Sequence, residues 1–131
     1  MEDSMIETIS TPNAPAAIGP YSQARVHNGI VYCSGQIALT PAGDDLTHQS
    51  IERQTEQAMT NLKAVLEAAG SDLRHVLKVN IFLIDMNEFA AVNSVYEQFF
   101  QSNPPARATV AVRALPRGAR VEIDCTAAQK S

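Results

Sequence analysis

A chain of 131 residues is long enough for one domain with a sizeable hydrophobic core and too short for two. Hydrophobic residues make up 45% of it and charged residues 18%, a globular composition that excludes a disordered chain. From the length we expect residues 1–131 to form a single domain. The net charge of −4 gives no general attraction to nucleic-acid phosphates, so we expect no nucleic-acid partner.

The two cysteines, Cys33 and Cys125, lie in strand-like runs and form no CxxC motif. This pattern favours free, buried thiols in a reducing cytosol over a disulfide scaffold. The three histidines are scattered without ligand spacing, so the sequence implies no metal. The acidic start Met1–Ser4 precedes no long apolar run, so we expect no signal peptide, transit peptide or membrane span.

The N-terminal part predicts strands joined by loops. Residues 5–9 can form a short edge strand, and the proline-containing segment 10–17 predicts a loop. Runs 24–27 and 30–34 flank Asn28-Gly29, a dipeptide that suits a type I′ turn. These two runs therefore predict a hairpin.

Two helices and a buried strand are predicted in the middle of the chain. Residues from about 50 to 69 have their apolar side chains on one stripe at helical spacing, and Gly70 is the expected stop. Residues 75–84 are apolar on both faces, which is typical of a covered central strand. Asp85 and Glu88 have the spacing of a capping box, and a second helix follows over about 88–101.

The C-terminal stretch 104–128 consists of two alternating runs on either side of turn residues 115–118. A tight hairpin here would place the polar residues of both runs on one face. Its register leaves open whether Arg107 contacts Glu122 directly. The cluster of arginines near the turn is either a solvated hairpin end or a contact for an anionic ligand; it comprises Arg113, Arg117 and Arg120.

The order of these elements predicts an α+β fold with a single mixed sheet of about six strands and two helices packed on one face. The other face would carry valine, alanine, isoleucine and threonine, with no second layer in the chain to cover it. Because a bare apolar face is rare in a monomeric protein, we predict that the chain self-associates.

Local chemistry leaves two interpretations open at each candidate site residue. Tyr21 follows Gly-Pro, whose stiff backbone can aim the hydroxyl at a ligand, or its ring packs against the domain. Ser34-Gly35 either lines a pocket or marks a bulge. Arg107 and Glu122 either bind a substrate carboxylate beside an acid/base group or form a structural cross-strand pair.

Several short blocks occur along the chain: IGPYSQA at 18–24, SGQ at 34–36, VN at 92–93, PAR at 105–107, LP at 115–116 and VEI at 121–123. Together they resemble the RidA (YjgF) family of imine deaminases, and the resemblance spans nearly the entire chain. It implies a chorismate-mutase-like fold, a homotrimer with its sheets facing inward, and active sites in the clefts between neighbouring subunits.

The resemblance also implies roles for individual residues. Arg107 would hold the substrate carboxylate, and Glu122 would position or activate the attacking water. The other site residues would be Tyr21, Ser34, Gly35, Asn93 (otherwise a helix-surface asparagine) and Thr109. Many family members carry a cysteine where this chain has Thr109, so catalysis by a thiol at that position is excluded here, whereas hydrolysis through a positioned water is not.

By this resemblance we expect the chain to be a cytoplasmic, cofactor-independent hydrolase acting on C=N bonds. Its substrates would be carboxylate-bearing imines such as 2-aminoacrylate/2-iminopropanoate and 2-iminobutanoate, and its products 2-oxo acids and ammonia. Two alternatives stay open: a pathway-specific deaminase of the 3-aminoacrylate or 2-aminomuconate type, and a non-catalytic regulatory protein that binds small ligands. RNA binding or cleavage fits the acidic balance least.

Overall fold

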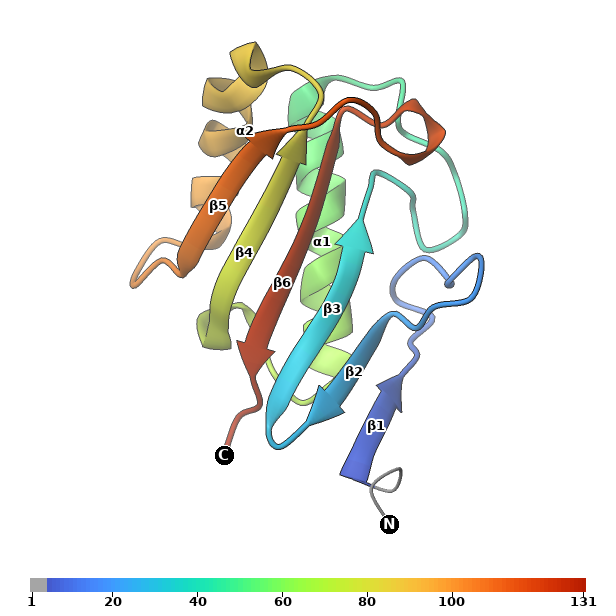
Figure 1. Cartoon of the computed structure of the whole chain (residues 1–131), viewed down its shortest axis with the longest axis vertical. Helices are drawn as coiled ribbons and strands as arrows, with labels where there is room; N and C mark the ends of the chain where they lie inside the picture. Colours follow the sequence, from blue (N-terminus) through green and yellow to red (C-terminus); the bar gives the residue numbers. More distant parts are fainter. Residues whose placement is uncertain (1–4) are drawn as a thin grey trace.

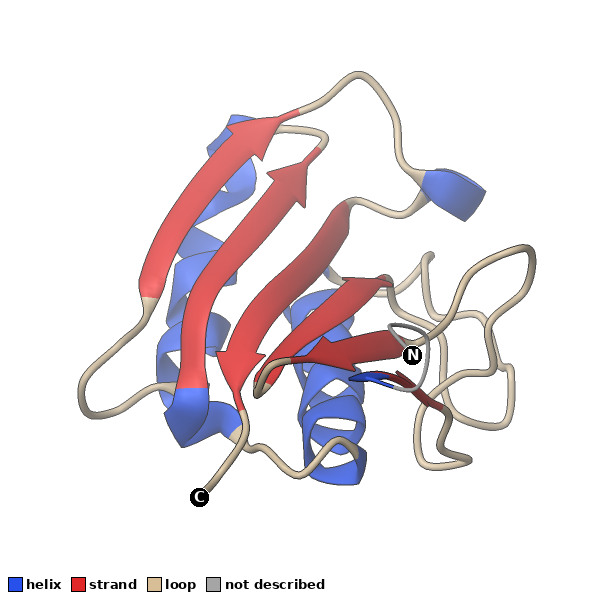
Figure 2. Ribbon diagram, turned by 60° about the horizontal axis from the view of Figure 1, so that its bottom comes forward, coloured by secondary structure: helices blue, strands red, loops and turns tan. Residues whose placement is uncertain are grey.

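The computed structural model describes residues 5–131, so Met1–Ser4, where the sequence predicts no targeting signal, lies outside the described residues. The strands are β1 (Ile6–Ile9), β2 (Ala24–His27), β3 (Ile30–Gln36), β4 (Val76–Leu83), β5 (Ala106–Ala111) and β6 (Val121–Ala128), and the helices are α1 (Ile51–Ala68) and α2 (Phe89–Tyr96). One mixed sheet has the strand order β1-β2-β3-β6-β4-β5. Both helices lie on one face of it (Figures 1 and 2), which confirms the predicted α+β architecture.

The predicted N-terminal hairpin is confirmed as the antiparallel pair β2 and β3. Asn28 and Gly29 have φ angles of 52° and 78°, the positive values that a type I′ turn requires. The first strand, β1, pairs only with β2 among the described strands and forms the expected edge.

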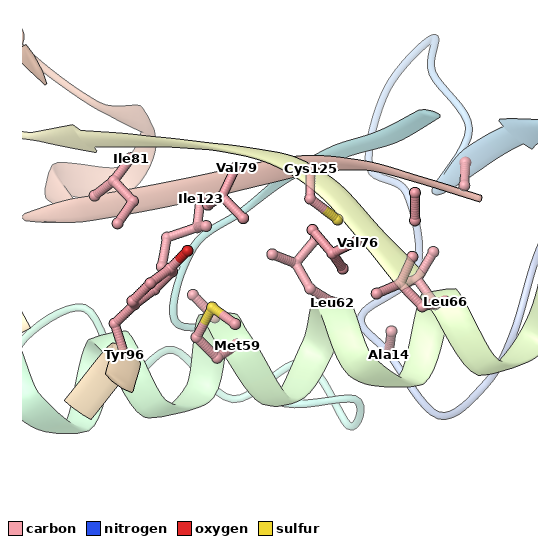
Figure 3. Close-up of a cluster of buried hydrophobic side chains, with 14 of the residues drawn as sticks. Ala14, Met59, Leu62, Leu66, Val76, Val79, Ile81, Tyr96, Ile123 and Cys125 are labelled. Atoms are coloured by element: carbon pink, nitrogen blue, oxygen red, sulfur yellow. The ribbon is translucent and has the colours of Figure 1, made fainter. Parts of the chain in front are cut away.

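Helix α1 packs its apolar stripe onto the sheet and forms most of the core. The Ser50 hydroxyl caps it by accepting a hydrogen bond from the Arg53 amide at 3.1 Å, and Gly70 at φ 78° follows its end. Each fully buried aliphatic side chain in this layer contributes about 1.5–3 kcal/mol. Figure 3 labels several of them: Met59, Leu62, Leu66, Val79, Ile81 and Ile123.

The second helix is shorter than predicted. The Asp85 carboxylate accepts a hydrogen bond from the Asn87 amide at 2.9 Å and so caps a 3₁₀ turn, after which α2 begins at Phe89. The helix ends at Tyr96 and tightens into a 3₁₀ turn up to Phe99. Neither α-helix of the described chain is long and apolar enough to cross a membrane.

The predicted C-terminal hairpin is wrong, because β5 and β6 are not neighbours. The strand β6 lies between β3 and β4 and is antiparallel to both, whereas β5 pairs in parallel with β4 at the sheet edge. The connection 112–120 is long enough for the chain to pass over the end of β4. Every second residue of β6 is fully buried, which suits a central strand, whereas β5 is mostly exposed and suits an edge.

This topology separates the two polar sets that a hairpin would have placed on one face. Arg107 pairs in register with the core residue Val79 and faces the helices, whereas Glu122 pairs with Phe82 and faces the open side. The open face also carries charged and amide side chains that the prediction did not include. Its exposed apolar residues include Tyr32, Ala106, Ala108 and Val110, which share it with the polar side chains of Lys78, Asn80, Glu122, Asp124 and Thr126.

Candidate active site

Four of the predicted site residues lie together at one end of the sheet. Tyr21, Ser34, Gly35 and Glu122 line a cavity of about 430 Å³, and we call them the β3–β6 cluster. The rest of the lining is largely apolar and comprises Pro15, Ala16, Ile18, Gln36, Ile37, Leu39, Pro116 and Arg117. A small, mostly apolar cavity with few polar groups is typical of a site for a small organic ligand.

A β-bulge shapes this cluster. The pairing of β3 with β6 shifts between Cys33 and Gln36, so Ser34 and Gly35 together face a single residue of β6. The Ser34 hydroxyl donates a hydrogen bond to the main-chain oxygen of Ser22 at 2.6 Å and ties the bulge to the preceding loop. The bulge is itself part of the cavity wall, so the two predicted interpretations of this dipeptide do not exclude each other.

Gly35 leaves the space that the Glu122 side chain occupies. A Cβ atom added to Gly35 would lie 2.1 Å from Glu122 Oε2 and 2.9 Å from its carboxyl carbon. Only glycine lets the carboxylate lie this close to the β3 backbone. Burial, and then the negative charge of Asp124, raise the pKa of Glu122 above its ordinary value. A carboxylate with a raised pKa is a stronger base once it is ionised.

The loop that carries Tyr21 is held by Gln23, a residue to which the sequence analysis gave no role. The buried Gln23 side chain accepts a hydrogen bond from the Thr11 amide at 2.7 Å and donates one to the Pro15 carbonyl at 2.8 Å. The Tyr21 hydroxyl accepts a hydrogen bond from the Ile18 amide at 3.3 Å, and the residue is 51% exposed. Tyr21 therefore stands at the cavity mouth rather than packing into the core.

Two of the three arginines near the turn make ion pairs within the chain. Arg117, which lines the cavity at φ 59°, has its guanidinium 3.7 Å from the Asp45 carboxylate. Arg120 forms an ion pair with Glu88 and thereby ties the start of β6 to the turn before α2. These contacts favour a structural role for Arg120 and place Arg117 at the cavity rim.

The remaining predicted site residues, Asn93, Arg107 and Thr109, form a second group on the other face of the sheet, which we call the β5–α2 cluster. Arg107 donates a hydrogen bond to the Asn93 side-chain oxygen at 2.7 Å. Its guanidinium carbon lies 5.0 Å from the ring centre of Tyr96 and 5.5 Å from that of Phe89. Three side chains of α2 therefore orient one arginine.

The sequence analysis gave Phe89 and Tyr96 no role at the site. Their spacing with Asn93 is i, i+4 and i+7, which places all three on one helix face, and this was the available signal. The Tyr96 hydroxyl and the Thr109 hydroxyl are both buried without a hydrogen-bond partner among residues 5–131. Burial raises the pKa of Tyr96, so its hydroxyl stays protonated as a donor.

The structure does not bring the two clusters together within one described chain. Arg107 lies on β5 and faces the helices, whereas Glu122 lies on β6 and faces the open side, with β4 between the two strands. The β5 strand pairs only with β4 among the described strands, so Arg107 stands at a free sheet edge. Each cluster is thus half of the predicted site.

A sequence profile of the family described as Endoribonuclease L-PSP matches residues 11–129. The 2-iminobutanoate/2-iminopropanoate deaminase of Capra hircus is 50% identical over 121 residues, which cover 92% of this chain and 88% of that protein. Among solved structures, yeast Mmf1 has a TM-score of 0.92 at 41% identity and covers 95% of this chain and 99% of its own. E. coli TdcF, solved with bound serine, has a TM-score of 0.89 at 36% identity, with coverage of 95% and 99%. The chain therefore belongs to the endoribonuclease L-PSP family, the RidA (YjgF) family that its sequence blocks resemble.

Proposed function

We propose that this protein is an imine deaminase that hydrolyses 2-imino acids such as 2-iminopropanoate and 2-iminobutanoate to 2-oxo acids and ammonia. The observation that carries the proposal is a matched pair of groups: the oriented guanidinium of Arg107 and the Glu122 carboxylate of raised pKa. A relative at 50% identity carries the name of this activity. TdcF, which was solved with bound serine, indicates that a related protein accommodates a ligand of this size with an α-carboxylate.

The proposed active site forms between two chains. Arg107 and Glu122 lie on opposite faces of their own sheet, so one residue pair can serve one substrate only if a neighbouring chain supplies one member. In this proposal the β5–α2 cluster of one subunit faces the β3–β6 cluster of the next subunit, and the two clusters together form one site. A head-to-tail contact of this kind closes into a ring, and the family resemblance makes that ring a homotrimer.

In this composite site Arg107 grips the substrate carboxylate through two parallel hydrogen bonds and so fixes the imine carbon. Glu122 accepts a proton from a water molecule while the oxygen of that water bonds to the imine carbon. Glu122 then returns this proton to the nitrogen of the resulting carbinolamine, the C–N bond breaks as the hydroxyl proton passes to Glu122 and the carbonyl forms, and ammonia leaves. Tyr21 and Ser34 lie beside Glu122 in the cavity, where their hydroxyls can hydrogen-bond the nitrogen and oxygen of this intermediate.

The proposed reaction is hydrolysis of a C=N bond without a cofactor. The imine carbon is already electrophilic, so positioning and proton transfer through Glu122 supply the catalysis. Cleavage of RNA, which the family description names, is the less favoured activity for this chain. The net charge is −4, and the open sheet face carries the carboxylates of Glu122 and Asp124, which repel phosphates.

The test couples a serine/threonine dehydratase, which releases the imine, to this protein and follows 2-oxo acid formation. Wild type should accelerate the step over a blank without protein. Arg107→Ala and Glu122→Gln should each lose about 100-fold or more, because each removes one of the charged groups that act on the substrate. No acceleration by wild type over the blank would refute the activity.

A subunit-mixing experiment tests the composite site separately. Arg107→Ala and Glu122→Gln chains are unfolded together, refolded as a mixture and assayed. If one chain supplies the arginine and its neighbour the glutamate, about a quarter of the sites contain both native residues and regain activity. Mixed assemblies that stay inactive would refute the intersubunit site.

A further inference from the structure

The two cysteines of the chain lie directly opposite each other on neighbouring strands. Cys33 of β3 pairs in register with Cys125 of β6, one position before the bulge begins. Both thiols are free, and both side chains lie on the helix-covered face. Figure 3 shows the Cys125 sulfur pointing from the sheet toward α1.

This placement satisfies the Cα spacing that a disulfide requires. Directly opposed residues of an antiparallel pair have Cα atoms about 4.5–5.5 Å apart, with side chains on the same face. Disulfides connect Cα atoms about 4.4–6.8 Å apart. The backbone therefore already holds the two cysteines at bonding distance, although they are far apart in the sequence.

The two thiols differ in access to solvent, which sets an order of reaction. Cys33 is partly exposed, whereas Cys125 is only 4% exposed. A side-chain hydrogen bond with Cys33, followed by burial, raises the pKa of the Cys125 thiol. An oxidant from solvent therefore reaches Cys33 first, and Cys125 is positioned to react with the product.

We propose that Cys33 and Cys125 form an oxidative modification site at which a hydroperoxide converts the pair to an intramolecular disulfide. The Cys33 sulfur attacks the peroxide O–O bond, which gives a sulfenic acid at Cys33 and one molecule of water. The Cys125 sulfur then displaces hydroxide from the sulfenic acid, and that hydroxide leaves as a second water with the Cys125 proton. Two thiols are oxidised by two electrons, and one hydrogen peroxide is reduced to two waters.

The site is independent of the proposed deaminase activity and is tested without it. Folded wild-type protein is treated with hydrogen peroxide, denatured, titrated for free thiols and mapped by mass spectrometry. We expect both thiols to disappear together, a mass loss of two hydrogens, a Cys33–Cys125 cross-linked peptide and reversal by a dithiol. Free thiols that persist, or cross-links between chains in its place, would overturn the proposal.

Single-cysteine variants test the order of reaction. Cys125→Ala removes the resolving thiol, so Cys33 should accumulate as a sulfenic acid that dimedone traps. Cys33→Ala leaves only the buried thiol, which should stay reduced under the same treatment. Peroxide treatment of wild type in urea is the control for the fold: because the strands then no longer hold the pair together, the intramolecular cross-link should form much more slowly. Equal rates in folded and unfolded protein would refute the assignment of the site to the strand register.

Discussion

Replacing Gly35 with alanine should disable the site while leaving the fold intact. The added Cβ would lie 2.1 Å from Glu122 Oε2, closer than such contacts occur, so the carboxylate must retreat by about 1 Å. Gly35 is not among the glycines with positive φ, so its backbone accepts alanine without strain.

The sizes of the expected losses in stability and in rate follow from which atoms move. The clash falls on the far end of a flexible side chain, and turning Glu122 off its rotamer costs about 0.5–1.5 kcal/mol of folding stability. Misplacing a catalytic group by about 1 Å costs about 100-fold in rate, or about 2.7 kcal/mol of barrier. Activity should therefore fall much further than stability.

The coupled imine assay measures kcat, and thermal unfolding measures stability. Gly29→Ala is the contrasting control, because Gly29 has φ 78° and nothing within 4 Å of an added Cβ, so it should lose stability and keep activity. The double variant Gly35→Ala/Glu122→Gln should be about as slow as Glu122→Gln alone, since both changes act through one carboxylate. A Gly35→Ala protein within twofold of wild-type kcat, or losses that multiply in the double variant, would refute the reasoning.

Three further changes have distinct expected results. Asn93→Ala removes a 2.7 Å hydrogen bond from the charged Arg107 and should raise KM about tenfold in steady-state kinetics with little change in kcat. Asp124→Asn removes the negative charge that helps to raise the pKa of Glu122, so the carboxylate ionises at lower pH and the acidic limb of the kcat/KM profile should move to lower pH. Gln54→Ala removes the hydrogen bonds that the buried Gln54 side chain makes with the Thr47 and Gln49 carbonyls and with the Arg120 amide just before β6, and should cost about 3 kcal/mol, or about 10 °C in thermal unfolding.

Each of these three predictions has a result that would contradict it. Asn93→Ala with unchanged KM would mean that the aromatic rings alone hold the arginine. If the acidic limb of the kcat/KM profile does not move in Asp124→Asn, then that limb does not report the ionisation of Glu122. For Gln54→Ala the comparison is Gln98→Ala, an exposed glutamine whose loss should change stability by less than about 0.5 kcal/mol; equal effects of the two would remove the buried network as the cause.

Local chemistry predicted the parts of the fold that depend on neighbouring residues. The turn at Asn28-Gly29 and the end of α1 at Gly70 follow from backbone angles that few other residues adopt. Strand neighbours were not predictable in this way, because alternation indicates which residues share a face and not which strand lies alongside. The separation of Arg107 from Glu122 is the consequence, since it depends on β6 entering between β3 and β4.

The side chains that orient Arg107 could not be predicted from the sequence for a different reason. Phe89 and Tyr96 have the spacing of core residues, and they are core residues on one side. Their ring faces also meet the guanidinium, which only the position of β5 against α2 reveals. Polar contacts between distant segments, such as those of Gln23 and Gln54, leave no periodic signal in a sequence.

The central place of β6 also governs how the sheet can be assembled. Its partner β3 precedes it by most of the chain, so the loop to be closed before they pair is long, and folding should be slow for a domain of this size. During synthesis β3 and β4 leave the ribosome before the strand that joins them. Until β6 arrives, two apolar strand edges lie open to other chains, which makes the nascent protein most prone to aggregate just before its sheet is complete.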